Sequence, residues 1–164
     1  MNILLFSPNE PRKNNFVQYH GFLLARRQLK DLILETNVIT DQPRNFINNH
    51  GWVKREIYEK IIRNSKLALC VHPFESLDYQ VVEIINLGTI PIISPTVRDN
   101  LNLPIDLVVD NVDSPIAISK KIIKILELPE ETYNDILELS QEAIKELAQK
   151  HNKELKIVLK NSFL

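Results

Sequence analysis

Cysteine and glycine are both scarce in this 164-residue chain, and each scarcity excludes a class of site. The single cysteine, Cys70, excludes an internal disulfide and a zinc site built on cysteines. The three glycines, Gly21, Gly51 and Gly88, cannot form a P-loop or the Gly-x-Gly-x-x-Gly motif of dinucleotide-binding proteins. A phosphate held by this chain would therefore depend on a helix N-terminus or on cationic side chains.

An excess of charge and long apolar runs are also lacking. Twenty Lys and Arg residues face 21 Asp and Glu residues, and this balance argues against nucleic acid as a partner. No apolar run approaches the roughly 18 residues of a membrane span, and no signal peptide precedes the first apolar segment. The four histidines have no helical metal-ligand spacing. We therefore expect a cytoplasmic protein with no integral membrane segment and no metal site.

Short apolar runs alternate with segments of helical periodicity along the whole chain. We expect strands at 2–6, 33–39, 67–71, 90–93 and 107–109, with a short one near 46–47, and helices at 16–32, 53–64, 78–87, 114–127, 130–149 and 152–160. Strands that are apolar on both faces and alternate with helices are typical of a parallel sheet covered on both sides.

The fold class predicted from this pattern is α/β. We expect one Rossmann-like domain over residues 1–164, with a parallel sheet of about six strands flanked by helices and a helical C-terminal segment from about residue 130. Ligands of such sheets bind outside the carboxyl ends of the strands. That rule points to four loops, at 7–15, 41–52, 72–79 and 94–100.

The most informative segment is 67–94, LALCVHPFESLDYQVVEIINLGTIPIIS, which combines two carboxylates with an expected helix start. Glu75 precedes the helix and Glu83 lies in its second turn, so both can face one crevice. The free backbone N–H groups of the helix N-terminus favour an anion there. A diphosphate could bind at this point, with sugar hydroxyls on the carboxylates at either side.

This segment resembles the Glu-x7-Glu motif of retaining GT-B glycosyltransferases of the group 1, GT4-like type, in their C-terminal, nucleotide-sugar-binding half. Glu75, Glu83, Gly88 and the strand Pro91-Ile92-Ile93 occur in the same order as in that motif. The segment that begins at Gly51-Trp52-Val53, the first strand and loop LLFSPNEPRKNN, and the helices at 115–127 and 130–149 are similar to further parts of that half. The resemblance covers nearly the whole chain.

The resemblance implies a role for each matching residue. Glu75 would contact the donor sugar as the catalytic residue, Glu83 would bind the ribose, and Lys13 with Arg12 would neutralise the diphosphate. Backbone N–H groups of Leu77 and Asp78 would complete the phosphate site, and His72 lies beside it at the end of a strand. The implied substrate is a nucleotide diphosphate sugar, with no cofactor and no metal.

Three departures from the family pattern bear on catalysis. Asp78 replaces a glycine and places a carboxylate where the diphosphate would approach, although it could instead cap the helix. Phe6-Ser7 replaces a Gly-Arg pair, so one phosphate-binding cation is missing. The acceptor-binding half is also absent from the 164 residues, so a partner protein, a second copy or the rest of a longer protein would supply it.

Other interpretations stay open for the same residues. Lys13, Glu75 and Glu83 could be solvated surface groups, and His72 could be a structural residue. Trp52 is expected to pack as core or loop cover, with base stacking as its alternative role. The whole chain could be a non-catalytic binding or scaffold subunit, or an inverting relative, since GTIPIISPTVRDNLNLP also resembles a segment of exostosin-type enzymes. A flavodoxin-like phosphoacceptor is disfavoured because no acidic cluster ends the first strand.

Overall fold

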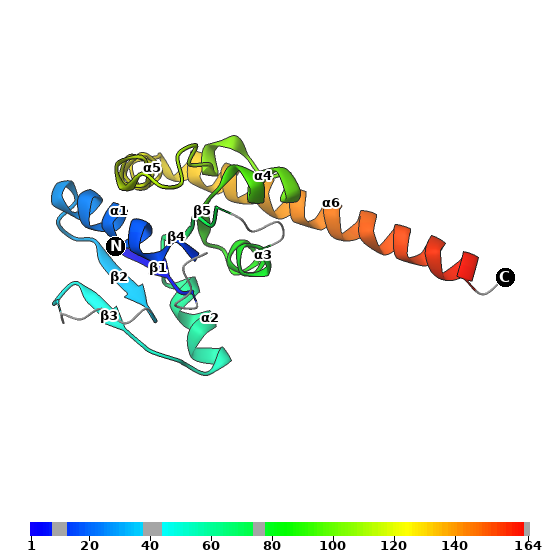
Figure 1. Cartoon of the computed structure of the whole chain (residues 1–164), viewed down its shortest axis with the longest axis horizontal. Coiled ribbons are helices and arrows are strands. Elements are labelled where there is room, and N and C mark those ends of the chain that lie inside the picture. Colours follow the sequence, from blue (N-terminus) through cyan, green and yellow to red (C-terminus); the bar gives the residue numbers. More distant parts are fainter. Residues whose placement is uncertain (8–12, 38–43, 74–77, 163–164) are drawn as a thin grey trace.

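The computed structural model describes residues 1–7, 13–37, 44–73 and 78–162, and their centre is a five-stranded parallel sheet (Figure 1). The strand order is β3-β2-β1-β4-β5. The strands are β1 (Asn2–Leu5), β2 (Ile33–Thr36), β3 (Ile47–Asn49), β4 (Leu67–Cys70) and β5 (Ile90–Ile93). The predicted α/β class is confirmed. The order reverses beside β1, between β1 and β4, and at such a switch point a parallel sheet offers a crevice for ligands.

The sixth predicted strand, at 107–109, is not a strand in the described part of the chain. A 3₁₀ turn, η2 (Ile105–Leu107), precedes one parallel bridge between Val108 and Ile93 of β5. Leu107, Val108 and Val109 are all buried. Their apolar run therefore reflects burial beside the edge of the sheet, without the ladder of hydrogen bonds that a strand requires.

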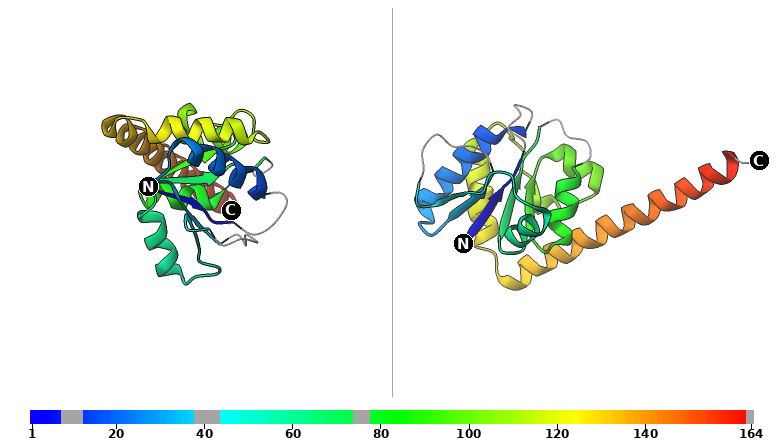
Figure 2. Two further views of the ribbon diagram at one scale, coloured as in Figure 1. Left: turned by 90° about the vertical axis from the view of Figure 1, so that its left-hand side faces the viewer. Right: turned by 90° about the horizontal axis from the view of Figure 1, so that it is seen from below.

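Helices cover both faces of the sheet and make a three-layered domain (Figure 2). Helices α1 (Asn15–Gln28) and α5 (Pro115–Leu126) lie on one face, and α2 (Arg55–Arg63) and α3 (Tyr79–Asn86) lie on the other (Figure 1). The segment 94–100, expected to be a loop, forms most of α4 (Pro95–Leu101). Pro95 occupies the first turn of this helix, where a missing N–H costs no intrahelical hydrogen bond.

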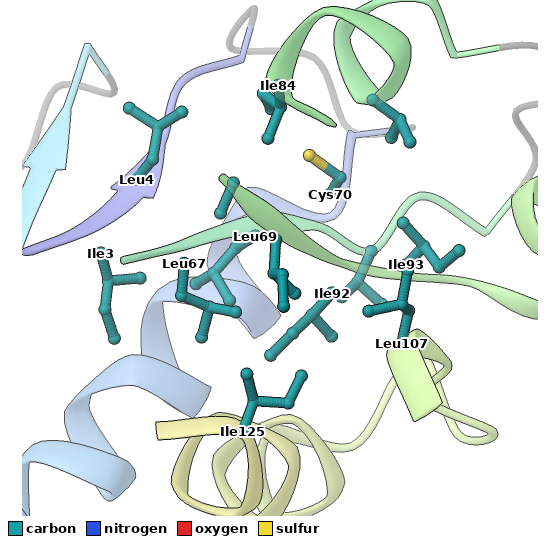
Figure 3. Close-up of a cluster of buried hydrophobic side chains, with 14 of the residues drawn as sticks. Ile3, Leu4, Leu67, Leu69, Cys70, Ile84, Ile92, Ile93, Leu107 and Ile125 are labelled. Atoms are coloured by element: carbon teal, nitrogen blue, oxygen red, sulfur yellow. The ribbon is translucent and has the colours of Figure 1, made fainter. Parts of the chain in front are cut away.

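The core is built from strand residues that alternate between the two helical layers (Figure 3). Leu4 and Cys70 point toward Ile84 of α3, whereas Leu67 and Leu69 point toward Ile125 of α5. All six side chains are at most 2 % exposed. Each fully buried Leu or Ile stabilises the fold by about 1.5–3 kcal/mol relative to leaving it in water. Cys70 is a core residue, as the sequence predicts.

Gly21 permits the close packing of two helices, and Gly88 permits the end of a third. A Cβ atom on Gly21 of α1 would lie 2.6 Å from Cγ2 of Ile118 in α5, so α1 and α5 pack at a distance that only glycine allows. Gly88 has a φ of +89° directly after α3, in the left-handed region where glycine is favoured. This position confirms that Gly88 ends the helix.

Helix α6 (Glu130–Ser162) is continuous, where the sequence suggests two helices with a break near residue 150. No glycine or proline follows Pro129 in the chain, so nothing in the backbone forces an interruption. The first part packs on the domain through Tyr133, Ile136 and Ile144. The remainder extends away from it (Figure 1). Within the described part of the chain, none of the helices has the length and apolar character needed to cross a membrane.

Candidate functional site

A cavity of about 460 Å³ lies at the carboxyl ends of the strands, and residues of α2 and α3 form part of its lining. Its walls come from the residues after β1 and β2, the loop between β3 and α2, the first turn of α2 and the first two turns of α3. The lining residues are Phe6, Ser7, Asn37, Gly51, Trp52, Val53, Arg55, Tyr58, Tyr79, Gln80 and Glu83. The cavity therefore lies where the topology of a parallel sheet predicts a ligand site.

Glu83 is the acidic group among the described cavity residues, and it is held by a cation from the opposite wall. Its side chain is 20 % exposed and forms an ion pair with Arg55 of α2. The guanidinium of Arg55 also donates from Nε to Oε1 of Glu59, at 2.7 Å. Burial raises the pKa of Glu83, Arg55 acts in the opposite direction, and Glu59 adds to the increase. The carboxylate can accept hydrogen bonds from a ligand in the cavity.

Gln80 fixes the relative position of the cavity walls. Its side-chain amide donates to the carbonyl oxygen of Phe6, at the end of β1, and to the hydroxyl of Tyr58 in α2, at 3.1 Å. The rings of Phe6 and Tyr58 lie 5.5 Å apart. Burial raises the pKa of Tyr58, so its hydroxyl is neutral at physiological pH. These contacts join the end of β1, α2 and α3 at the base of the cavity.

Two aromatic side chains of the cavity wall are largely in solvent. Trp52 is 87 % exposed and Tyr79 is 77 % exposed. The expectation that Trp52 packs as core or loop cover is therefore wrong. An exposed tryptophan in a cavity wall gains no burial within the fold, but it presents a flat apolar surface to a ligand.

The loop that carries Trp52 is anchored by His50, two residues before it. His50 lies 2.6 Å from Oε2 of the buried Glu35, and the backbone N–H of His50 donates to Thr36 at 2.8 Å. Gly51 then has a φ of +58°, which allows the chain to turn into the cavity wall. The position of Trp52 is thus set from the end of β2.

Lys13, His72 and Asp78 form a separate cluster that we call the buried charge cluster. The three residues are 7 %, 1 % and 4 % exposed, and none of them lines the cavity. Nδ1 of His72 lies 2.7 Å from Oδ2 of Asp78. The other carboxylate oxygen of Asp78 accepts from the backbone N–H of Gln80, at 3.0 Å. Asp78 therefore caps α3, and His72 is a buried residue with a carboxylate partner.

Gln18 of α1 connects Lys13 of the buried charge cluster to the sheet. Its side-chain amide donates to the carbonyl oxygen of Lys13, and its amide oxygen accepts from the backbone N–H of Val71, after β4. Both distances are below 3.0 Å, and Gln18 is fully buried. The start of α1 is thereby held against the end of β4.

The carboxylate of Asp78 is ionised at neutral pH. Burial acts to raise the pKa of Asp78, but the hydrogen bond and charge of His72, the charge of Lys13 and the hydrogen bond from Gln80 together lower it. The buried charge cluster therefore contains a permanent negative charge surrounded by donors and a lysine.

The fold of this chain is similar to that of several solved structures. No family model and no curated protein sequence matches the chain. Among solved structures, trehalose-6-phosphate synthase OtsA has a TM-score of 0.74, with 12 % identity over 96 % of this chain and 42 % of that chain. The trehalose-6-phosphate structure from E. coli bound with UDP-2-fluoro glucose has a TM-score of 0.77, with 10 % identity over 96 % and 43 % of the two chains.

A third similar structure is the α,α-trehalose-phosphate synthase (UDP-forming) from Burkholderia xenovorans in complex with glucose-6-phosphate. Its TM-score is 0.76, with 8 % identity over 94 % of this chain and 43 % of that one. The chain has the fold of half a GT-B glycosyltransferase. It spans less than half the length of each of these structures.

The GT-B half-fold separates the predicted site residues into two places. Glu83 lies in the cavity wall, whereas Lys13, His72 and Asp78 belong to the buried charge cluster. Three further predicted residues, Arg12, Glu75 and Leu77, lie outside the described residues. Among the side chains that the structure describes, no three His, Cys, Asp or Glu groups are arranged to hold a metal ion.

Sequence reasoning did not single out several residues of the cavity. They include Arg55, Tyr58 and Gln80. These side chains come together only because α2 and α3 lie on the same face of the sheet. The sequence does contain a signal for Tyr79. It is a large aromatic residue at the first position of a helix, at the edge of the sheet where a ligand is expected, and there it has no core to pack against.

Proposed function

We propose that the cavity binds the nucleoside part of a nucleotide diphosphate sugar, and that the chain is the donor-binding half of a glycosyltransferase. One observation carries the proposal: a half-buried carboxylate and two exposed aromatic side chains line one cavity at the carboxyl edge of a GT-B half-fold. The similar E. coli structure bound with UDP-2-fluoro glucose supports this class of ligand.

Each part of a nucleoside has a matching group in the cavity. The base would stack on Trp52 or Tyr79, an interaction worth about 1–3 kcal/mol per base. The ribose hydroxyls would donate to the carboxylate of Glu83, which Arg55 orients from the opposite wall. Asn37, whose side-chain oxygen accepts from the backbone N–H of Ser7 at 2.9 Å, also lines the cavity and could contact the ligand.

The finer assignment follows the resemblance to retaining GT-B enzymes. That resemblance assigns the donor sugar to Glu75, the diphosphate to Lys13 and Arg12, and the diphosphate oxygens to the backbone N–H groups of Leu77 and Asp78. The carboxylate of Asp78 opposes a diphosphate at the start of α3. Transfer with retention would also need an acceptor-binding half to close the cleft and exclude water. In this proposal a partner protein, a second copy of the chain or the rest of a longer protein supplies that half.

A non-catalytic nucleotide-binding subunit is the second candidate function, and the buried charge cluster favours it. Lys13, the cation expected at the diphosphate, is 7 % exposed and lies near the carboxylate of Asp78. Release of a nucleoside diphosphate needs cationic groups that stabilise the departing charge. Donor hydrolysis or transfer, assayed with candidate partner proteins, distinguishes the two functions.

The binding test uses Trp52, which is the only tryptophan of the chain. Its fluorescence and calorimetry would be followed during titration with uridine, adenosine and guanosine, and with UDP-glucose, ADP-glucose and GDP-mannose. We expect one base to change the fluorescence of Trp52 selectively. Absence of binding for every nucleoside and nucleotide sugar at millimolar concentration would overturn the proposed function.

A variant of Glu83 tests the ribose contact. A hydrogen bond to a charged group is worth about 1.5–3 kcal/mol, so Glu83→Gln should weaken nucleoside binding about tenfold or more. Glu59→Gln is the matched control, because Glu59 also pairs with Arg55 but does not line the cavity. Equal affinities of the Glu83→Gln and Glu59→Gln variants would contradict the assignment of Glu83.

A further inference from the structure

Three features that attract anions meet at the start of α3, and a side chain of the protein already occupies their meeting point. They are the N-terminus of an eight-residue helix, the ring of His72 and the ammonium group of Lys13. The carboxylate of Asp78 accepts from Gln80 N with one oxygen and lies 2.7 Å from His72 with the other. Because all three residues of the buried charge cluster are less than 10 % exposed, this anion is enclosed within the fold.

The carboxylate of Asp78 has stabilising partners within the protein. The carboxylate is ionised at neutral pH, and Lys13 supplies a positive charge close enough to stabilise it. A phosphate that approached the start of α3 would meet a like charge, and this repulsion is strong where water is excluded. The helix N–H group of Gln80, which a phosphate would otherwise use, is already satisfied by Asp78.

The cavity itself offers little positive charge that could offset the repulsion between Asp78 and a diphosphate. Among its described residues, Arg55 is the only cation, and it pairs with both Glu83 and Glu59. The described wall therefore contains a carboxylate for hydroxyl groups and aromatic faces for a base, but no cation that lacks an acidic partner. This composition suits the uncharged end of a nucleotide.

We infer that Asp78 is a specificity-determining residue that takes the place of a phosphate at the start of α3, so that the site selects its ligand by the nucleoside and gains no affinity from a diphosphate. The inference rests on the proposed function insofar as the cavity is taken to bind the nucleoside. It predicts that nucleosides compete effectively with nucleotide sugars for this protein.

The experiment compares a nucleoside, its monophosphate and its diphosphate on the wild-type chain and on Asp78→Asn. Asparagine keeps an oxygen that can cap α3 but removes the charge. In the wild type we expect the three dissociation constants to agree within about threefold. In Asp78→Asn the ratio of the diphosphate affinity to the nucleoside affinity should rise about tenfold. Asp78→Ser, which also retains a capping oxygen, provides a second variant if Asp78→Asn folds poorly.

Asp99→Asn is the matched control, because Asp99 is exposed on α4 and its loss changes the net charge by the same amount. A wild-type diphosphate affinity ten or more times that of the nucleoside would overturn the inference and leave the proposed function standing. Unchanged affinity ratios in both Asp78 variants would also overturn it.

Inorganic pyrophosphate separates this inference from the proposed function. The wild-type chain should show no calorimetric binding of pyrophosphate at millimolar concentration, whereas Asp78→Asn should bind it. This comparison does not require nucleoside binding, so it decides the role of Asp78 even if every nucleoside fails to bind. Binding of pyrophosphate to the wild type, or to neither protein, would contradict the role given to Asp78.

Discussion

At the residue scale, Asp78 links the stability of the fold to pH. Its pKa is lower in the folded protein than its ordinary value, despite burial, because His72, Lys13 and Gln80 stabilise the charged form. A carboxyl group with a depressed pKa contributes stability that is fully present above the unfolded pKa of about 4 and is lost as the pH falls through the folded value. We expect Asp78→Asn to lower the free energy of unfolding by about 1–3 kcal/mol near neutral pH.

The difference in the free energy of unfolding between the wild type and Asp78→Asn should shrink as the pH falls below about 4, because the wild-type carboxylate then becomes protonated. Urea unfolding of the two proteins between pH 3 and pH 7 measures it, with Asp99→Asn as the control for one exposed carboxylate. A difference that stays constant over this range would mean that the charge of Asp78 does not contribute to stability.

At the element scale, the contact between α1 and α5 depends on the absence of a side chain at Gly21. An alanine there would place Cβ 2.6 Å from Cγ2 of Ile118 and 3.3 Å from the carbonyl oxygen of Pro115. Alanine gains up to about 1 kcal/mol in helix propensity, but overpacking costs about 1–3 kcal/mol. We expect Gly21→Ala to lower the free energy of unfolding by about 1–2 kcal/mol, measured by urea denaturation.

A double-mutant cycle identifies the cause of that loss. Ile118→Ala removes Cγ2 but keeps Cβ, which would lie 2.8 Å from the new Cβ, so it should relieve the overlap in part. The cost of the double variant should then be smaller than the sum of the two single costs. Additive costs would show that Gly21→Ala destabilises the protein by another route.

The elements that the sequence predicts well are those defined by local patterns. The buried strands β4 and β5 are short apolar runs, and α3 is bounded by Asp78 and Gly88. The sequence predicts a loop at 94–100, where the structure has α4, which begins with proline in its first turn as many helices do. The run at 107–109 was assigned as a strand because burial and strand pairing give the same apolar pattern.

The candidate site could be predicted only in part, for a physical reason. Glu83 follows from its place on α3 at the carboxyl edge of the sheet. Arg55 reaches Glu83 from another helix, and the burial of Lys13 depends on α1, the end of β4 and the start of α3 together. Such meetings depend on tertiary packing, which a local pattern does not contain.

At the scale of the whole molecule, α6 divides into a part that belongs to the domain and a part that does not. Ser140 and Ile144 are at most 8 % exposed, whereas residues 148–152 are exposed. Beyond residue 152 the helix extends roughly 15 Å further, at a rise of 1.5 Å per residue (Figure 2). A helical segment without tertiary contacts contributes little to folding stability. We expect a chain that ends at Lys150 to keep its free energy of unfolding within about 0.5 kcal/mol of the wild type.

A chain that ends at Leu139 provides the comparison, because it also loses the buried Ser140 and Ile144. Loss of one buried isoleucine side chain costs about 2–5 kcal/mol, so this chain should unfold at much lower urea concentration. Urea denaturation at two protein concentrations measures both chains. A large loss on removal of residues 151–164 that shrinks when both proteins are diluted would mean that the extended helix associates with a second copy. Only then would the stability of the wild type depend on its concentration.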